Sequence, residues 1–173
     1  MNPRHLGLFI ISAFIALTLP FQSNGQQVIF VARHVDTQKL LRMDAPIRDD
    51  TPLSESGRRH AGTFAERLKD AGITAIYTSK TARTIQTAEP LAKLLGLQIN
   101  KISRRDIDGL IRRLREKHQG DRVLVVGHWT TMPGILRRLG YTKKVRIERS
   151  VRNDLFVVIP KPDKPPVVVY IHY

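Results

Sequence analysis

Apolar residues are grouped along the chain into short runs that predict β-strands. Three of the runs, 28–32, 75–77 and 123–126, are continuously apolar and do not alternate with polar positions. Strands that are buried on both faces of a parallel sheet have this pattern. Two more runs, 155–159 and 167–171, follow near the end of the chain and have the same apolar character. The pattern therefore predicts a buried sheet.

Between these runs, apolar residues recur at intervals of three and four, as on one face of an α-helix. Ser54 precedes the first such stripe as a candidate N-cap, and the fourth starts near Pro133 and ends at Gly140. Pro90 lies inside the second stripe and is expected to kink or interrupt that helix. The four stripes are Ala61, Phe64, Ala65 and Leu68; Ala82, Ile85, Ala88 and Ala92; Ile107, Leu110, Ile111 and Leu114; and Met132, Ile135, Leu136 and Leu139.

Strands that alternate with helices predict an α/β fold with a mostly parallel sheet covered on both faces. The segment 160–166, with the sequence PKPDKPP, is too short to hold a crossover helix. The last two strands are therefore expected to form an antiparallel hairpin at one edge. The loop over residues 35–52 has mixed polarity and no clear period, so it could help to cover a site.

Residues 1–25 have the layout of a secretory signal peptide, which leaves one domain over residues 26–173. A short basic region precedes an uncharged apolar stretch at 6–19, and Ser23 and Gly25 are small residues before a cleavage site. An uncleaved anchor is the alternative, but a spanning helix needs about 20 apolar residues. We expect an exported protein, in the periplasm or secreted, with no stable membrane span after cleavage.

The composition favours anionic partners. The 173-residue chain carries 29 Lys and Arg against 15 Asp and Glu, a formal net charge of +14. Such a charge attracts phosphorylated metabolites, surface phosphates or nucleic acid, although it also serves solubility. The basic helices lack interleaved aromatic residues for base stacking, so we expect no nucleic-acid partner. Cysteine is absent, which excludes disulfides and zinc–thiolate sites.

Three strand ends carry residues suited to phosphate. Arg33 and His34 follow the first run, Arg83 follows the second after a short Thr/Ser segment, and His128 follows the third. The carboxyl ends of parallel strands are where ligands bind in open α/β sheets. Arginine presents a planar fork of donors to phosphoryl oxygens, and a neutral imidazole can attack phosphorus. The sequence therefore predicts one anion pocket built from two histidines and two arginines.

These segments, in this order and spacing, resemble the histidine phosphatase superfamily, which includes cofactor-dependent phosphoglycerate mutases and short bacterial phosphohistidine phosphatases. The resemblance covers residues 28–173. The segments are Arg33-His34-Val35-Asp36-Thr37, Pro52-Leu53-Ser54-Glu55-Ser56-Gly57, Thr78-Ser79 through Arg83-Thr84-Ile85-Gln86-Thr87-Ala88, and Val126-Gly127-His128.

The resemblance implies a three-layer α/β/α fold of the phosphoglycerate mutase type. It also implies that His34 is the phosphorylated nucleophile and that Arg33, Arg83 and His128 complete the phosphate pocket. Thr37 and Trp129 are expected to contact the substrate, with Trp129 as an aromatic wall. No cofactor is expected. Two histidines flanked by arginines are also unsuited to a metal ion. The predicted substrate is a small or surface-linked phosphate monoester, or a phosphoramidate.

The chain departs from the family pattern at three points. Val35 stands where a glycine usually follows the nucleophilic histidine, and Leu40 stands where mutases and sugar bisphosphatases usually carry asparagine. No segment matches the family's Leu-Asn-Glu, which supplies the acid that protonates the leaving group. We therefore expect a phosphatase and no mutase activity. A catalytically weak phosphate- or polyanion-binding protein is the alternative.

The leaving-group acid is the least determined residue. A carboxyl group whose pKa is raised by burial would serve, and the candidates are Asp108 and Asp36. For Asp106 and Asp108 the competing interpretation is capping of the third helix, and for Asp154 it is a strand start or a partner of an arginine. Outside the predicted leader, the other histidines, His60, His118 and His172, are interpreted as structural or solvent-exposed. The sequence gives no indication of the oligomeric state.

Overall fold

The computed structural model describes residues 25–37, 50–148, 150 and 153–173. In these residues six strands alternate with four helices. Three predicted features lie outside the described residues. They are the leader at residues 1–25 (except Gly25), most of the loop at 35–52, and Leu40. The elements are β1 (Val28–Arg33), α1 (Glu55–Leu68), β2 (Ala75–Ser79), α2 (Ala82–Leu95), β3 (Ile99–Ile102), α3 (Ile107–Lys117), β4 (Arg122–Gly127), α4 (Met132–Arg138), β5 (Asp154–Lys161) and β6 (Lys164–His172).

The strands form one six-stranded sheet in the order β3-β2-β4-β1-β5-β6. The pairs β3–β2, β2–β4 and β4–β1 are parallel, whereas β1–β5 and β5–β6 are antiparallel. The predicted terminal hairpin at one edge is therefore confirmed. Lys161 pairs with Lys164 across its turn, and Asp163 there has a φ of 53°, a conformation that Asp adopts more readily than most residues.

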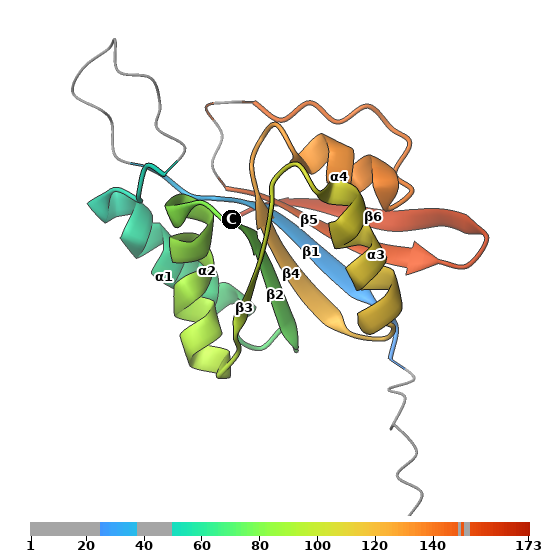
Figure 1. Ribbon diagram of the computed structural model, residues 1–173, viewed down its shortest axis with the longest axis horizontal. Helices are drawn as coiled ribbons and strands as arrows, with labels where there is room; N and C mark the ends of the chain where they lie inside the picture. The colour runs from blue at the N-terminus through green and yellow to red at the C-terminus, as the bar shows by residue number, and fades with distance from the viewer. Residues whose placement is uncertain (1–24, 38–49, 149, 151–152) are drawn as a thin grey trace, which may run out of the picture.

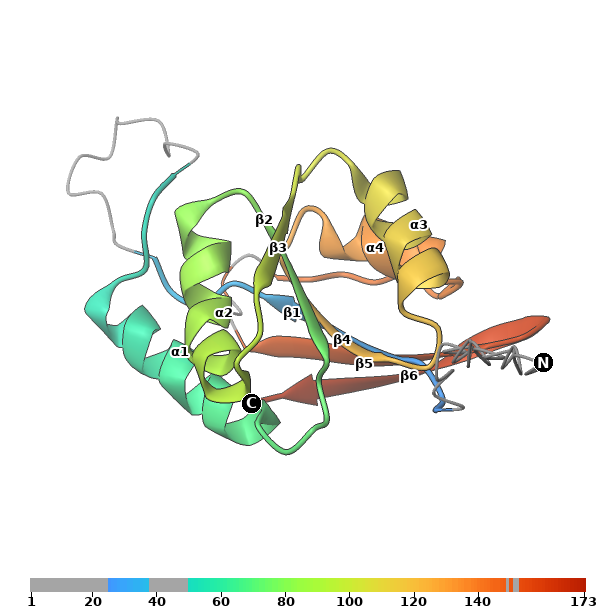
Figure 2. The same cartoon turned by 60° about the horizontal axis from the view of Figure 1, so that its bottom comes forward.

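The helices cover both faces of the sheet, which confirms the three-layer α/β/α architecture. Helices α1 and α2 lie together on one face, and α3 and α4 lie on the other (Figures 1 and 2). Each face has its own core, because neighbouring residues of a strand point to opposite sides. Val31 and Val125 pack toward α3 and α4, while Ala32 and Val126 pack toward α1 and α2.

Helix α1 begins where the sequence predicts, and its cap explains why. The Ser54 side chain accepts a hydrogen bond from the backbone N–H of Gly57 at 3.0 Å. Such a cap satisfies one of the backbone donors that the first helical turn leaves without an intrahelical partner. Asp106 caps α3 in the same way, with the N–H of Gly109 as donor at 3.0 Å.

Pro90 does not interrupt α2, so this part of the prediction is wrong. The helix runs unbroken from Ala82 to Leu95 with Pro90 inside it, and it ends at Gly96 in a left-handed conformation. A proline removes one helical hydrogen bond at a cost of about 3 kcal/mol. Ala88, Leu91 and Ala92 flank Pro90 and are buried against the sheet. This burial offsets the lost hydrogen bond.

The edges of the sheet also differ from the prediction. Strand β3 has four residues, two of them polar and exposed, and its pattern did not predict a strand. It is held by pairing with β2 and by a hydrogen bond from the Asn100 side chain to the Ile76 carbonyl. Strand β6 was expected to be buried, but it is the opposite edge strand, and Val169 there is 47% exposed.

No helix in the described part of the chain is long and apolar enough to cross a membrane.

Packing of α3 gives a first prediction. Leu114 is fully buried against the sheet, whereas Leu94 on α2 is 53% exposed. Leu114→Ala should lower the free energy of unfolding by about 2–5 kcal/mol, because it removes buried methyl groups and leaves a cavity. Leu94→Ala, the matched control, should change it by less than about 1 kcal/mol. Urea denaturation followed by circular dichroism measures both, and equal losses would contradict the assigned core.

Candidate active site

The site is built on the parallel pairing of β1 and β4. Arg33, the last residue of β1, lies opposite Gly127, the last residue of β4. The ladder continues one step further, since the backbone N–H of His34 donates to the Gly127 carbonyl at 3.1 Å. His34 and His128 therefore leave adjacent strand ends together. Their ring centroids are 5.4 Å apart in an edge-to-face arrangement.

Two arginines lie beside these histidines. Arg33 is 1% exposed, and its guanidinium donates to the backbone carbonyl of Glu148 at 2.9 Å. Arg83 lies in the first turn of α2, with a guanidinium nitrogen 3.4 Å from Nδ1 of His128. Both arginines act electrostatically on His34. The structure thus brings the four predicted residues into one cluster, which we call the phosphate pocket.

His34 is held as a neutral imidazole with a defined tautomer. Its Nδ1 is 2.8 Å from the backbone oxygen of Val35, and a carbonyl only accepts hydrogen bonds, so Nδ1 carries the proton. Nε2 therefore keeps its lone pair. Burial lowers the pKa of His34 from 6.5 to about 3, and the charges of Arg83 and Arg33 lower it as well. At neutral pH the ring is uncharged and can act as a nucleophile.

Val35, which replaces the usual glycine, fits without entering a polar environment. Its side chain is 2% exposed and packs with Leu53 and Ala61 in a small apolar cluster. Its backbone N–H donates to the Thr87 hydroxyl at 3.2 Å, and that hydroxyl donates to the Arg83 carbonyl at 2.7 Å. The valine therefore helps to fix the segment after His34 against α1 and α2.

A cluster of buried hydroxyl groups supports His128, and the sequence reasoning missed it. Ser79, at the end of β2, has its hydroxyl 2.9 Å from Nε2 of His128. It also lies 3.0 Å from the Thr81 hydroxyl and 2.8 Å from the Thr84 hydroxyl. The signal was present, because hydroxyl residues are dense between the second apolar run and Arg83.

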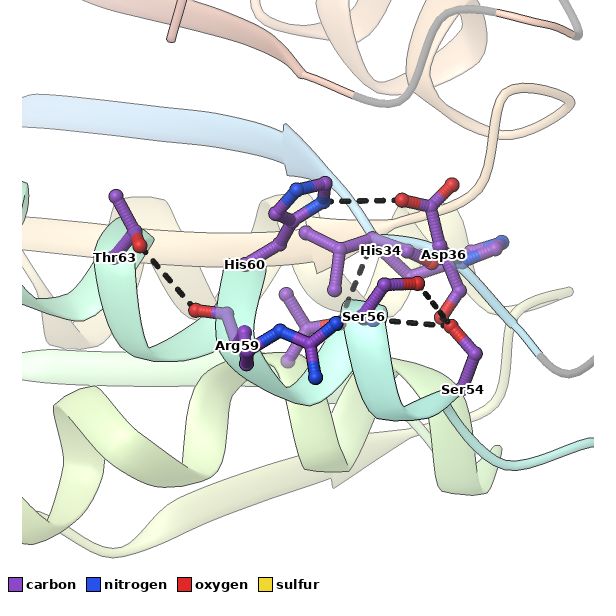
Figure 3. A network of polar contacts seen from close by, with 10 residues as sticks. His34, Asp36, Ser54, Ser56, Arg59, His60 and Thr63 are labelled. Atoms are coloured by element: carbon purple, nitrogen blue, oxygen red, sulfur yellow. Dashed lines mark hydrogen bonds and ion pairs between the residues drawn. The ribbon is translucent and has the colours of Figure 1, made fainter.

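Asp36 and His60 form a second contact that involves a histidine, beyond the C-terminal end of β1. Nδ1 of His60, on α1, is 3.0 Å from a carboxylate oxygen of Asp36, two residues beyond His34 (Figure 3). The backbone carbonyl of Asp36 accepts from the N–H of Ser54 at 3.1 Å. His60 is exposed, as the sequence suggested, but it has an acidic partner that the sequence did not reveal. Asp36 thereby links the segment after β1 to α1.

Asp108 does not have the surroundings that a leaving-group acid needs. It lies on the exposed first turn of α3 and pairs with Arg138 of α4, whose second guanidinium nitrogen is 3.3 Å from a carboxylate oxygen. The hydrogen bond from Arg138 lowers the pKa of Asp108, whereas a leaving-group acid needs a raised pKa. Asp108 therefore ties α3 to α4. Asp154 begins β5 and accepts from the Tyr170 hydroxyl at 2.5 Å.

The two further substrate-contact candidates lie beyond the same strand ends. Thr37 is half-buried and its backbone forms an isolated antiparallel bridge with Leu53. Trp129 follows His128 directly, is 38% exposed, and lines a surface depression with Arg146, Glu148 and other residues of the loop after α4.

His118 and His172 lie away from the phosphate pocket. His118 bonds the Tyr77 hydroxyl and the Asp121 carboxylate, each at 2.8 Å, near the C-terminal end of α3. His172 is exposed on β6. In the part of the chain described, no three His, Cys, Asp or Glu side chains are placed to hold a metal ion.

Comparisons with known proteins point to one family. The model of the histidine phosphatase superfamily (branch 1) matches residues 29–104, which include His34 and Arg83. A protein named "Probable phosphoglycerate mutase GpmB" from Photorhabdus laumondii is 35% identical over 92 residues, or 53% of this chain and 39% of the relative. Its namesake from Cronobacter sakazakii is 38% identical over 71 residues, or 41% and 33%. The chain thus spans about a third to two fifths of these curated relatives.

Solved structures show the same fold at low sequence identity. The protein histidine phosphatase SixA, complexed with tungstate, superposes with a TM-score of 0.62 at 19% identity, over 84% of this chain and 96% of that one. The alpha-ribazole phosphatase from Shigella flexneri gives a TM-score of 0.65 at 16% identity, over 84% and 96%. At these identities the likeness concerns the fold.

The lowered pKa of His34 predicts a loss of stability in mild acid. The unfolded chain binds a proton at His34 below pH 6.5 while the folded chain resists it down to about pH 3. The free energy of unfolding should therefore fall as the pH drops through this window. Between pH 7 and 5.5 this one residue should account for about 1 kcal/mol.

His34→Asn removes the titrating group and should reduce the slope of stability against pH by that amount. Urea titrations at several pH values, with the unaltered chain in parallel, measure the two slopes. Identical slopes would show that His34 is not held neutral in the folded protein.

Proposed function

Since this chain belongs to the histidine phosphatase superfamily, we propose that it is a metal-independent phosphatase that hydrolyses phosphate esters through a phosphohistidine intermediate on His34. The observation that carries the proposal is the state of the His34 ring. Its Nδ1 donates to the Val35 carbonyl, and its pKa is about 3. The Nε2 lone pair is thus available for attack on phosphorus at neutral pH.

The rest of the phosphate pocket supplies what phosphoryl transfer needs. Charge develops on three equatorial oxygens while the nucleophile and the leaving group lie in line. Arg33 and Arg83 are both buried and both act electrostatically on His34, in a setting where guanidinium donors are stronger than in water. Their side chains remain charged at any relevant pH. We assign them to the oxygens of the transferred group, with His128 as a further hydrogen-bonding partner.

Hydrolysis is a better fit to this chain than the mutase activity in the names of its curated relatives. Those names belong to proteins of which the chain spans less than half. Leu40 replaces the mutase asparagine, and the Leu-Asn-Glu segment has no match. A mutase must also retain the phosphorylated enzyme between substrates, whereas a phosphatase needs only water as the second acceptor. The substrate is therefore assigned to the class of phosphate monoesters or phosphoramidates.

We place the protein outside the cytoplasm, on the basis of the leader-like residues 1–25. The net charge of +14 suits a phosphorylated molecule that is free in the envelope or attached to an anionic surface. The phosphate pocket itself holds two arginines, so the charge and the chemistry favour the same substrates.

The central test is the nucleophile. His34→Ala should abolish hydrolysis of 4-nitrophenyl phosphate, a loss of at least about 1000-fold, because no other group replaces the attacking Nε2. With a ³²P-labelled substrate, quenching should trap an acid-labile phosphoenzyme only in the chain that retains His34. Full activity of His34→Ala would exclude the mechanism.

Two controls accompany this test. His172→Ala removes an exposed histidine on β6 and should leave the rate unchanged. EDTA should also leave the rate of the unaltered chain unchanged, whereas strong inhibition would indicate a metal enzyme. Tight binding of vanadate without turnover on a broad panel of phosphorylated compounds would favour a phosphate-binding protein over an enzyme.

Export is tested separately. The full chain, expressed in a Gram-negative bacterium with a C-terminal tag, should be recovered in the periplasmic fraction, with Gln26 as its first residue by mass spectrometry. Deletion of residues 1–25 should retain it in the cytoplasm. A full-length chain in the membrane fraction would show that the leader is an anchor.

A further inference from the structure

His128 has both ring nitrogens engaged, on opposite sides of the ring. Nε2 lies 2.9 Å from the Ser79 hydroxyl, and Nδ1 lies 3.4 Å from a guanidinium nitrogen of Arg83. The side chain is 4% exposed, so its orientation is set by these neighbours and not by solvent. Nδ1 is the nitrogen on the side of Arg83, and therefore of the phosphate pocket.

The Arg83 contact indicates which nitrogen of the neutral His128 ring carries the proton. A guanidinium group has only donors, so Nδ1 takes part in this contact with its lone pair. In a neutral imidazole the other nitrogen then carries the hydrogen. Nε2–H of His128 is therefore the donor to the oxygen of Ser79.

The hydroxyl cluster is arranged to accept that hydrogen bond. The Thr84 hydroxyl lies 2.9 Å from the Thr81 carbonyl and 3.0 Å from the Ser79 carbonyl. Carbonyls only accept, so the single hydrogen of Thr84 is used there, and its oxygen accepts from Ser79 at 2.8 Å. With Nε2–H of His128 as the donor, the Ser79 oxygen accepts from the ring and the Ser79 hydrogen is left to donate to Thr84; the Thr81 hydroxyl, 3.0 Å from Ser79, is the alternative acceptor. The donors run in one direction, from His128 to Ser79 to Thr84 to the backbone.

We propose that Ser79 is a positioning residue that keeps the proton of His128 on Nε2, and that Nδ1 of His128 is the atom that carries a proton to the leaving group. This proposal rests on the proposed phosphatase function. It assigns the proton donor that the sequence left open, without a carboxyl group. The arrangement resembles a catalytic triad. There, one nitrogen of a histidine ring exchanges protons with the reacting groups, and a buried acceptor holds the hydrogen on the other nitrogen.

In the first step the substrate itself supplies the proton. A phosphate monoester has its second pKa near 6, so its monoanion brings one proton on a phosphoryl oxygen. That proton moves to Nδ1 of His128, while the Arg83 guanidinium donates to the phosphoryl oxygens. The bond between Nε2 of His34 and phosphorus forms and the ester P–O bond breaks. The leaving oxygen takes the proton from Nδ1 and departs as the alcohol.

The second step returns the enzyme to its starting state. A water oxygen bonds to phosphorus, and the P–N bond to His34 breaks, so that Nε2 regains its lone pair. One water proton passes to Nδ1 of His128 and from there to an oxygen of the product phosphate. The net reaction is the ester monoanion plus water giving alcohol plus dihydrogen phosphate. Throughout both steps Nε2–H of His128 remains bonded to Ser79.

The tautomer is measured directly by ¹⁵N NMR of the chain labelled at histidine. In the unaltered protein at pH 7.5 the His128 resonances should show a protonated Nε2 and an unprotonated Nδ1. Ser79→Ala should give a mixture of tautomers, and Ser79→Thr, which keeps the hydroxyl, should restore the single form. Ser103→Ala makes the same chemical change after the neighbouring strand β3 and should have no effect. A protonated Nδ1 in the neutral unaltered chain, or an unchanged tautomer in Ser79→Ala, would overturn the assignment.

The proton-carrier role is measured by the dependence of the rate on the leaving group. An alkoxide needs protonation far more than 4-nitrophenolate does. Ser79→Ala should therefore lower kcat for an alkyl phosphate by about 10- to 100-fold more than for 4-nitrophenyl phosphate, with KM changed less than kcat. His128→Ala should show the same selectivity with larger losses.

The possible outcomes separate the two proposals. Equal losses of kcat on both substrates in Ser79→Ala would mean that Ser79 only maintains the pocket. Equal losses on both substrates in His128→Ala would exclude His128 as the proton carrier. If the unaltered chain hydrolyses neither substrate, the proposed function fails and the proton-carrier role fails with it. The tautomer assignment would then still be decided by the NMR spectrum, because it requires no turnover.

Discussion

The parallel pairing of β1 with β4 is the interaction on which the site depends. It sets Arg33 opposite Gly127, and the following hydrogen bond from His34 to Gly127 extends the ladder by one residue. Two histidines that are 94 positions apart along the chain thus become neighbours. A shift of this register by one residue would turn one ring to the other side of the sheet, so the apolar cores on both faces indirectly fix the geometry of the polar pocket.

The pocket combines concentrated positive charge with the neutral imidazole of His34. Burial and the two arginines oppose protonation of His34, and its ring is oriented by a backbone carbonyl. His128 is oriented by a hydroxyl cluster. The groups that orient the two rings are neutral, so they add no negative charge beside the arginines, and the positive charge of the arginines favours a bound phosphoryl group. The same burial of a basic ring reduces stability in acid, which is a cost of keeping the His34 ring neutral.

The sequence predicted the fold and the four residues of the pocket because both depend on local patterns. Continuous apolar runs, three-and-four spacing and the residues after each strand are visible without tertiary contacts. Where the prediction failed, packing or pairing outweighed the local signal. Pro90 stays inside α2 because its neighbours are buried, and β3 exists because β2 offers it a partner. Asp108 resembled a candidate acid until its pairing with Arg138 became visible.

By itself, the sequence indicated the α/β architecture, the positions of His34, Arg83 and His128 at or shortly after strand ends, and a resemblance to a phosphate-handling family. Only the tertiary structure decided which nitrogen of each ring is available, since this depends on the Val35 carbonyl, the Ser79 hydroxyl and the Arg83 guanidinium at specific distances. It also gave Asp36 a partner in His60 and placed Val35 in an apolar cluster. The physical reason is that residue type fixes which hydrogen bonds are possible, whereas only three-dimensional contact fixes which of them form.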